Sequence, residues 1–145
     1  MLPPKYSFAV RNLYPLEKDN PYILMVDDSA LVSERLAGIL HETGIPLRMA
    51  WARNYGQAMN ILAAGTGIPA IIVLDINLPG KSGLHLLRAV KAAHNDIIAI
   101  MFTNQAGAHY RSLSQLLGAD YFLDKSNDFE QLPGLLCSLA AALRH

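Results

Sequence analysis

Short apolar runs alternate with amphipathic segments along most of this chain, and this alternation limits the possible fold more than any other feature. Five runs rich in strand-forming side chains predict strands at 22–26, 47–51, 70–74, 97–102 and 120–123. The segments that follow them repeat apolar residues at helical spacing, which predicts helices at 29–43, 54–64, 83–94, 105–117 and 128–143. A chain that alternates in this way is expected to form an α/β fold with a doubly wound parallel sheet and helices on both faces.

The length and composition fit one such domain. The chain has 145 residues, of which 52% are hydrophobic, so a sizeable core can form and disorder of the whole chain is excluded. Residues 1–20 hold three prolines and show no clear period, and we interpret them as an N-terminal arm. Residues 21–145 are then the folded domain.

Charge and cysteine content exclude several classes of function. Twelve Lys and Arg residues balance twelve Asp and Glu residues, so no basic field points to nucleic acid. Cys137 is the single cysteine, which excludes an intramolecular disulfide and a multi-cysteine zinc site. No apolar run approaches the roughly 18 residues that span a bilayer, and the first residues lack the apolar stretch of a signal peptide. We therefore expect a cytoplasmic protein with no nucleic-acid partner and no membrane segment.

Polar side chains follow four of the five predicted strands, at the edge where doubly wound sheets bind ligands. These residues are Asp27 and Asp28 after the first strand, Asp75 after the third, Thr103 after the fourth and Lys125 after the fifth. An aspartate after a strand is often only a turn residue, so each position alone is weak evidence. Because these residues all follow strands that end at the same edge of the predicted sheet, together they predict a single polar site.

The chemistry of these groups points to phosphoryl transfer. Three carboxylates close together repel one another, and a hard divalent cation such as Mg²⁺ removes the conflict. Asp75 heads the central strand, and a carboxylate can accept a phosphoryl group as an acyl phosphate. Lys125 would supply a second positive charge, and the Thr103 hydroxyl can hydrogen-bond a phosphoryl oxygen.

Four segments together carry a specific resemblance to a known family: VDDS (26–29), LDINLPGKSGL (74–84), FTN (102–104) and GADYFLDK (118–125). Over about residues 21–143 the chain resembles the receiver domain of bacterial response regulators, of the CheY-like single-domain chemotaxis type. The resemblance implies a flavodoxin-like strand order, 2-1-3-4-5. It also implies phosphorylation by a sensor histidine kinase or a His-containing phosphotransfer protein.

The resemblance assigns roles residue by residue. It implies that Asp75 is the phosphoacceptor, with Thr103 and Lys125 acting on the phosphoryl group. Mg²⁺ would be held by Asp27, Asp28, Asp75 and the backbone carbonyl of Asn77. Thr103 and Phe122 match the pair whose movement switches the surface of the domain, although an aromatic residue in a fifth strand is equally well explained as core.

Two positions depart from the family pattern. Ser126 follows Lys125 where the family usually has proline, and we predict a trans peptide bond there because a cis bond before a non-proline residue costs about 2.5–4 kcal/mol. Asn104 follows Thr103 where a small residue is usual. Its bulk predicts slower self-dephosphorylation or slower uptake from acetyl phosphate, and Asn77 and Gln105 could orient an attacking water.

These observations favour a single-domain response regulator that catalyses its own phosphorylation and slow dephosphorylation and is not a turnover enzyme. Only residues 126–145 follow Lys125, so we expect output through a downstream protein that the sequence does not identify, or through relay. Small residues on the last helix also leave a homodimer open. Two alternatives remain: a degenerate receiver that acts as a phosphorylation-independent adaptor, and an Asp-based small-molecule phosphatase. Asn77 disfavours the phosphatase, which would use an aspartate two residues after its nucleophile.

Overall fold

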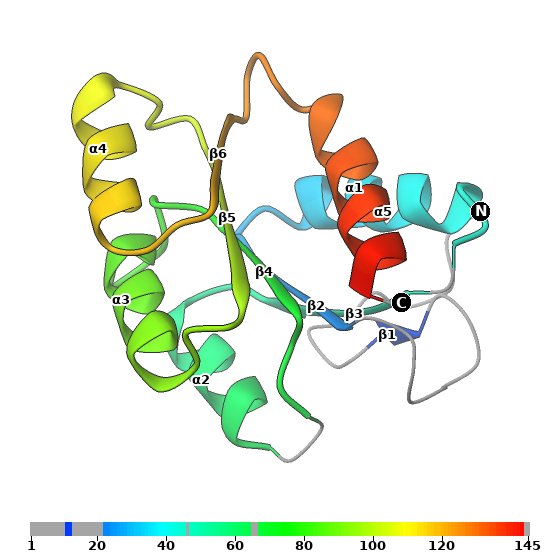
Figure 1. The fold of residues 1–145 in the computed structure, drawn as a ribbon, viewed down its shortest axis with the longest axis horizontal. Coiled ribbons are helices and arrows are strands. Elements are labelled where there is room, and N and C mark those ends of the chain that lie inside the picture. The colour runs from blue at the N-terminus through cyan, green and yellow to red at the C-terminus, as the bar shows by residue number, and fades with distance from the viewer. Residues whose placement is uncertain (1–10, 13–21, 46, 65–66, 144–145) are drawn as a thin grey trace.

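The computed structural model describes residues 11–12, 22–45, 47–64 and 67–143. Its centre is a twisted sheet with helices on both faces (Figure 1). Five parallel strands lie in the order β3–β2–β4–β5–β6, namely Arg48–Ala52, Tyr22–Val26, Ile71–Leu74, Ile98–Thr103 and Tyr121–Asp124. Counted along the chain from β2, this is the order 2-1-3-4-5, so the predicted fold class is confirmed.

Five helices lie within the described ranges, at α1 (Ala30–Glu42), α2 (Tyr55–Ala63), α3 (Gly83–Ala93), α4 (Ala108–Leu116) and α5 (Gln131–Leu143). Buried leucines of α1 and α5 pack on one face of the sheet. The apolar sides of α2, α3 and α4 pack on the other face. Crossovers that place helices on both faces bury β2 and β4 along their whole length, which is why these two strands are continuous apolar runs.

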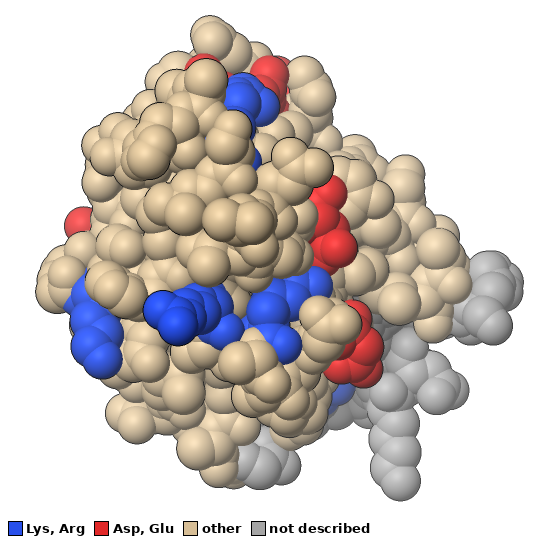
Figure 2. Space-filling view, turned by 60° about the vertical axis from the view of Figure 1, so that its left-hand side comes forward, with Lys and Arg blue, Asp and Glu red and all other residues tan. Residues whose placement is uncertain are grey.

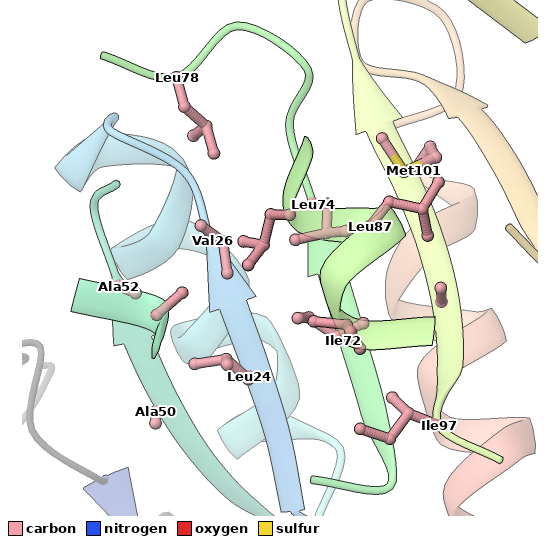
Figure 3. Close-up of a cluster of buried hydrophobic side chains, with 14 of the residues drawn as sticks. Leu24, Val26, Ala50, Ala52, Ile72, Leu74, Leu78, Leu87, Ile97 and Met101 are labelled. Atoms are coloured by element: carbon pink, nitrogen blue, oxygen red, sulfur yellow. The ribbon is translucent and has the colours of Figure 1, made fainter. Parts of the chain in front are cut away.

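The strands divide their side chains between two cores. In β2, Ile23 and Met25 face α1 and α5, whereas Leu24 and Val26 enter the opposite core with Ile72 and Leu74 of β4 (Figure 3). Full burial of a side chain of this size is worth about 1.5–3 kcal/mol. The central strands are therefore held firmly by packing on both faces, and this packing also fixes the positions of the residues directly after them.

A short sixth strand extends the sheet. Arg11–Asn12 forms β1, which pairs antiparallel with β3 at the edge of the sheet. These two residues belong to the segment 1–20 that the sequence assigned to an arm, and the rest of that segment lies outside the described residues. Two residues carry no detectable alternation of apolar and polar side chains, which explains why the sequence did not predict the strand.

Two helices begin later than predicted because turns precede them. Helix α4 begins at Ala108 after Gly107, and a hydrogen bond from the Ala106 N–H to the Asn104 carbonyl holds the preceding turn. Helix α5 begins at Gln131, and Pro133 is its third residue, where its missing N–H is not needed by the helix. No described helix combines the length and apolar character that crossing a membrane requires.

Charged side chains are sparse on the face shown in Figure 2. Lys and Arg side chains form a short row across this view, and acidic side chains lie at one end of the row. The basic groups on this face are thus partly balanced, in keeping with the formal net charge of zero.

Candidate functional site

Three of the predicted site residues are placed by the parallel strands themselves. The Asp27 N–H donates to the Ala52 carbonyl at 3.0 Å, and the Asp75 N–H donates to the Val26 carbonyl at 3.0 Å. The Lys125 N–H donates to the Thr103 carbonyl at 2.9 Å in the same way. Each residue therefore extends the ladder of the strand before it, and their side chains lie at one edge of the sheet.

The Lys125 ammonium bridges two buried carboxylates. Its Nζ lies 2.6 Å from Asp27 Oδ2 and 2.7 Å from Asp75 Oδ2. Asp27 is fully buried and Asp75 is 6% exposed, so neither acid can rely on water to stabilise its charge. Backbone N–H groups complete the contacts, because Ser29 donates to Asp27 Oδ1 at 2.9 Å and Asn77 donates to Asp75 Oδ1 at 3.1 Å.

Burial and mutual contact shift the pKa values of Asp27 and Lys125. Burial raises the pKa of the Asp27 carboxyl above its ordinary value, and hydrogen bonds from Lys125 and from the Ser29 N–H oppose that rise only in part. Burial alone would lower the pKa of the Lys125 ammonium, but its hydrogen bonds with Asp27 and Asp75 outweigh this effect and leave the pKa raised. Lys125 therefore remains a cation at neutral pH.

Asp28 completes an acidic cluster with Asp27 and Asp75. Each of the three offers an oxygen atom, and these atoms all lie within 4.8 Å of one another. Asp28 is exposed and opens the cluster to solvent. Hard oxygen donors at this spacing suit a hard divalent cation, which would offset their mutual repulsion. We call Asp27, Asp28, Asp75 and Lys125 the acid–lysine centre.

A glycine allows the start of α3 to approach the backbone of Asp75 closely. Gly83 begins α3, and its N–H donates to the Ile76 carbonyl at 2.9 Å. A Cβ atom added at Gly83 would lie 1.9 Å from the Asp75 carbonyl oxygen. Any larger residue would push the start of α3 away from the loop that carries Asp75.

Neutral polar residues follow Asp75, Thr103 and Lys125 in the loops at this edge of the sheet. Gln105 Nε2 donates to Asn77 Oδ1 at 3.4 Å, and the Ser126 hydroxyl donates to Asn104 Oδ1 at 2.7 Å. We call Asn77, Asn104, Gln105 and Ser126 the outer edge. The two positions that depart from the family pattern, Asn104 and Ser126, thus bond to each other. No cis peptide bond occurs among the described residues, so the predicted trans bond before Ser126 is confirmed.

Thr103 and Phe122 lie on neighbouring strands behind the centre. Thr103 is fully buried at the end of β5, and its Oγ1 accepts a hydrogen bond from the Gln105 N–H at 3.1 Å. Phe122 is half-buried on β6, and the Arg111 guanidinium of α4 lies 4.6 Å from the centroid of its ring. Phe122 is therefore neither fully core nor fully exposed, and its role as a switch stays a prediction.

One contact to the site was not predicted from the sequence. Trp51 of β3 packs in the core with Met25 and Met49. Its Nε1–H also donates to the backbone carbonyl of Asp27 at 2.7 Å. The two residues are 24 positions apart, and no motif links them, so the sequence held no signal for this bond.

Comparison with known proteins places this geometry in one family. The family model for the response regulator receiver domain matches residues 23–136. The chain therefore belongs to the receiver domains of two-component response regulators.

Curated relatives agree with this assignment. The transcriptional regulatory protein AruR of Pseudomonas aeruginosa is 29% identical over 126 residues, which cover 86% of this chain and 51% of AruR. The phosphate regulon transcriptional regulatory protein PhoB of Klebsiella pneumoniae is 32% identical over 105 residues, or 71% of this chain and 44% of PhoB. The chain thus spans about half the length of the curated relatives it matches.

Solved structures share the fold. A CheY-like receiver domain protein from Methanospirillum hungatei superposes with a TM-score of 0.73 at 22% identity, covering 86% of this chain and 96% of that one. The Mn²⁺-bound form of response regulator Rcp1 gives a TM-score of 0.71 at 25% identity, with 82% and 91% covered.

Proposed function

We propose that this receiver domain accepts a phosphoryl group on Asp75 in a Mg²⁺-dependent reaction and signals through contacts with other proteins. The observation that carries the proposal is the acid–lysine centre: a buried carboxylate directly after the central strand β4, bound by Lys125 and flanked by two further aspartates. This arrangement combines a nucleophile with positive charge on one side and metal ligands on the other.

In the proposed reaction an oxygen of Asp75 attacks the phosphorus of a phosphohistidine. An O–P bond forms, the N–P bond breaks, and the imidazole nitrogen leaves with the bonding electron pair. The Asn77 N–H and the Lys125 ammonium, which both contact the Asp75 carboxylate, hold it in place for the attack. Lys125 then offsets the negative charge that the transferred group brings.

Mg²⁺ would be held by Asp27, Asp28 and Asp75, with the backbone carbonyl of Asn77 as a further ligand. The fit rests on the three carboxylate oxygens lying within 4.8 Å of one another and on the exposure of Asp28 to solvent. When bound, the ion supplies positive charge to the phosphoryl oxygens. The Mn²⁺-bound form of Rcp1 supports a divalent cation in a receiver fold.

Phosphorylation would change the surface near α4 and β6. The phosphoryl group would add about −1.5 to −2 charge at neutral pH, at the end of the sheet where the neighbouring strand β5 places the buried Thr103. Thr103 would exchange its Gln105 N–H contact for a phosphoryl oxygen, and Phe122 on the adjacent strand would follow. The contact of Arg111 with Phe122 would carry this change to α4.

Partners belong to the same proposal. A sensor histidine kinase or a His-containing phosphotransfer protein would donate the phosphoryl group, and a downstream protein would read the result in the cytoplasm, as is typical of receiver domains. The protein acts as a phosphoacceptor that catalyses its own phosphorylation and slow dephosphorylation, and not as a turnover enzyme. The curated relatives named above are transcriptional regulators, which supports a role in signalling.

Mass spectrometry tests the proposal. The protein is incubated with a phosphodonor such as acetyl phosphate, with and without Mg²⁺, and the intact mass is measured. We expect a gain of one phosphoryl group that requires Mg²⁺ and disappears in Asp75→Asn. No gain with any donor or kinase would favour the adaptor, and steady hydrolysis of a small phosphate ester would favour a phosphatase.

A further inference from the structure

We propose that Trp51 is a positioning residue of the metal site, because its indole N–H holds the peptide group that joins Asp27 to Asp28. In this role Trp51 keeps the exposed Asp28 carboxylate within reach of the other two acids. The inference rests on the proposed Mg²⁺ site and adds to it a residue outside the acid–lysine centre.

The contact itself is buried and short. Trp51 is 6% exposed and lies in β3 beside Met25 of β2. Its Nε1–H donates to the Asp27 carbonyl oxygen at 2.7 Å. Because a buried carbonyl without a partner costs about 1–3 kcal/mol, the indole and the peptide group keep each other in one orientation.

The bond lies where the strand ladder ends. The Asp27 N–H still pairs with the Ala52 carbonyl of β3, but the next residues leave the sheet and turn into the N-cap of α1 at Ser29. The carbonyl of Asp27 and the N–H of Asp28 belong to a single planar peptide group. Fixing this carbonyl therefore fixes the direction in which Asp28 leaves the strand.

Asp28 depends on this support more than the other acids do. Asp27 is held by Lys125 and the Ser29 N–H, and Asp75 by Lys125 and the Asn77 N–H. In the part of the chain that the structure describes, no hydrogen bond or ion pair is found for the Asp28 side chain. Its distance from Asp27 and Asp75 is thus controlled mainly by the backbone that Trp51 holds.

Loss of this bond is expected to weaken Mg²⁺ binding without abolishing it. Removing groups that orient metal ligands typically costs 10–100-fold in affinity, and a contact that acts through one peptide group belongs at the low end of that range. We therefore expect Trp51→Phe, which keeps an aromatic ring but removes the N–H, to raise the dissociation constant for Mg²⁺ about tenfold.

The test compares Trp51→Phe with Met49→Ala by titration calorimetry with Mg²⁺ and by thermal unfolding. Met49 lies on the same strand and in the same core cluster, and it is 2% exposed. Met49→Ala should lower stability yet leave the Mg²⁺ affinity within twofold of the wild type. An unchanged affinity in Trp51→Phe, or an equal loss in Met49→Ala, would overturn the inference while the proposed function stands. Absence of Mg²⁺ binding by the wild type would overturn the proposed function as well.

A second measurement needs no variant. Trp51 is the single tryptophan of the chain, so the indole N–H gives one cross-peak in a proton–nitrogen NMR spectrum. We expect this cross-peak to shift during a Mg²⁺ titration, with the same midpoint as the calorimetric binding curve. A cross-peak that does not move at saturating Mg²⁺ would contradict the inference even if Trp51→Phe failed to fold.

Discussion

The acid–lysine centre and the outer edge differ in burial, charge and origin. The centre consists of charged groups that lie directly after the strands β2, β4 and β6; two of them are buried, Lys125 is half-buried and Asp28 is exposed. The outer edge consists of neutral amides and a hydroxyl, of which Asn77, Asn104 and Ser126 are exposed. The centre matches the family motifs, whereas Asn104 and Ser126 of the outer edge depart from them.

This difference suggests that the acid–lysine centre determines whether phosphorylation occurs and that the outer edge adjusts its rate. Charged groups in a buried setting interact strongly, so changes in the centre should decide whether phosphorylation occurs and how stable the fold is. Exposed neutral groups exchange their hydrogen bonds with water at little cost, so changes in the outer edge should alter rates by modest factors.

Gly83→Ala should have the largest effect on stability. The new Cβ would meet the Asp75 carbonyl oxygen at 1.9 Å, and backbone atoms cannot move aside as a flexible side chain can. We expect the free energy of unfolding to fall by more than about 3 kcal/mol in urea titrations. Gly134→Ala in α5 is the matched control, because nothing lies within 4 Å of its added Cβ. Gly134→Ala should raise the free energy of unfolding slightly. Equal stability of the two variants would refute the close approach of Gly83 to the Asp75 carbonyl.

Lys125→Met removes the cation that Asp27 and Asp75 share. We expect a loss of about 2 kcal/mol in metal-free unfolding experiments, below the usual cost of breaking a buried pair because Asp27 can take up a proton instead. Saturating Mg²⁺ should recover part of this loss. Lys81→Met replaces an exposed lysine over the Tyr55 ring and should change stability by less than about 0.5 kcal/mol. A similar loss in both variants would remove the special role of Lys125.

Asn104→Ala tests whether the outer edge controls the lifetime of the phosphoryl group. Removing this side chain should open the path of water to Asp75 and speed the loss of phosphate by about three- to tenfold, equivalent to roughly 1 kcal/mol in the barrier. Release of inorganic phosphate from the phosphorylated protein measures this rate. An unchanged rate would show that Asn104 does not limit access.

Ser126→Ala should have the smallest effect of the four. It removes the hydroxyl that donates to Asn104 Oδ1 at 2.7 Å but leaves the Asn104 side chain in place. One exposed hydrogen bond has a net value of about 0.5–1.5 kcal/mol, and only part of it would reach the barrier, so we expect about a twofold change in the same assay. If Ser126→Ala changes the rate of phosphate loss more than Asn104→Ala does, the Ser126 hydroxyl has a role of its own.

The fold and the centre were predictable for one physical reason. Parallel strands joined by right-handed crossovers end at the same edge of the sheet, so residues placed directly after strands meet in space. Asp27, Asp75 and Lys125 follow from this rule even though Asp27 and Lys125 are 98 positions apart in the sequence. Apolar periodicity likewise predicted five parallel strands and five helices.

Individual hydrogen bonds around the site could not be predicted. The bond between Ser126 and Asn104 and the bond between Trp51 and Asp27 depend on rotamers and on turns of two or three residues. The starts of α4 and α5 at Ala108 and Gln131 depend on the same turns. Local backbone geometry leaves little trace in apolar periodicity, so the sequence predicted the position of the site but not the bonds around its edge.

Mapping the phosphorylated residue distinguishes Asp75 from every other carboxylate as the phosphoacceptor. The protein is phosphorylated in the presence of Mg²⁺, treated with borohydride, digested and analysed by tandem mass spectrometry. Borohydride reduces an acyl phosphate to an alcohol, so phosphorylated Asp75 would appear as homoserine at position 75. We expect homoserine at position 75 in a Mg²⁺-dependent amount and at no other aspartate. Homoserine at Asp27 or Asp28, or phosphate on a residue outside the acid–lysine centre, would contradict it.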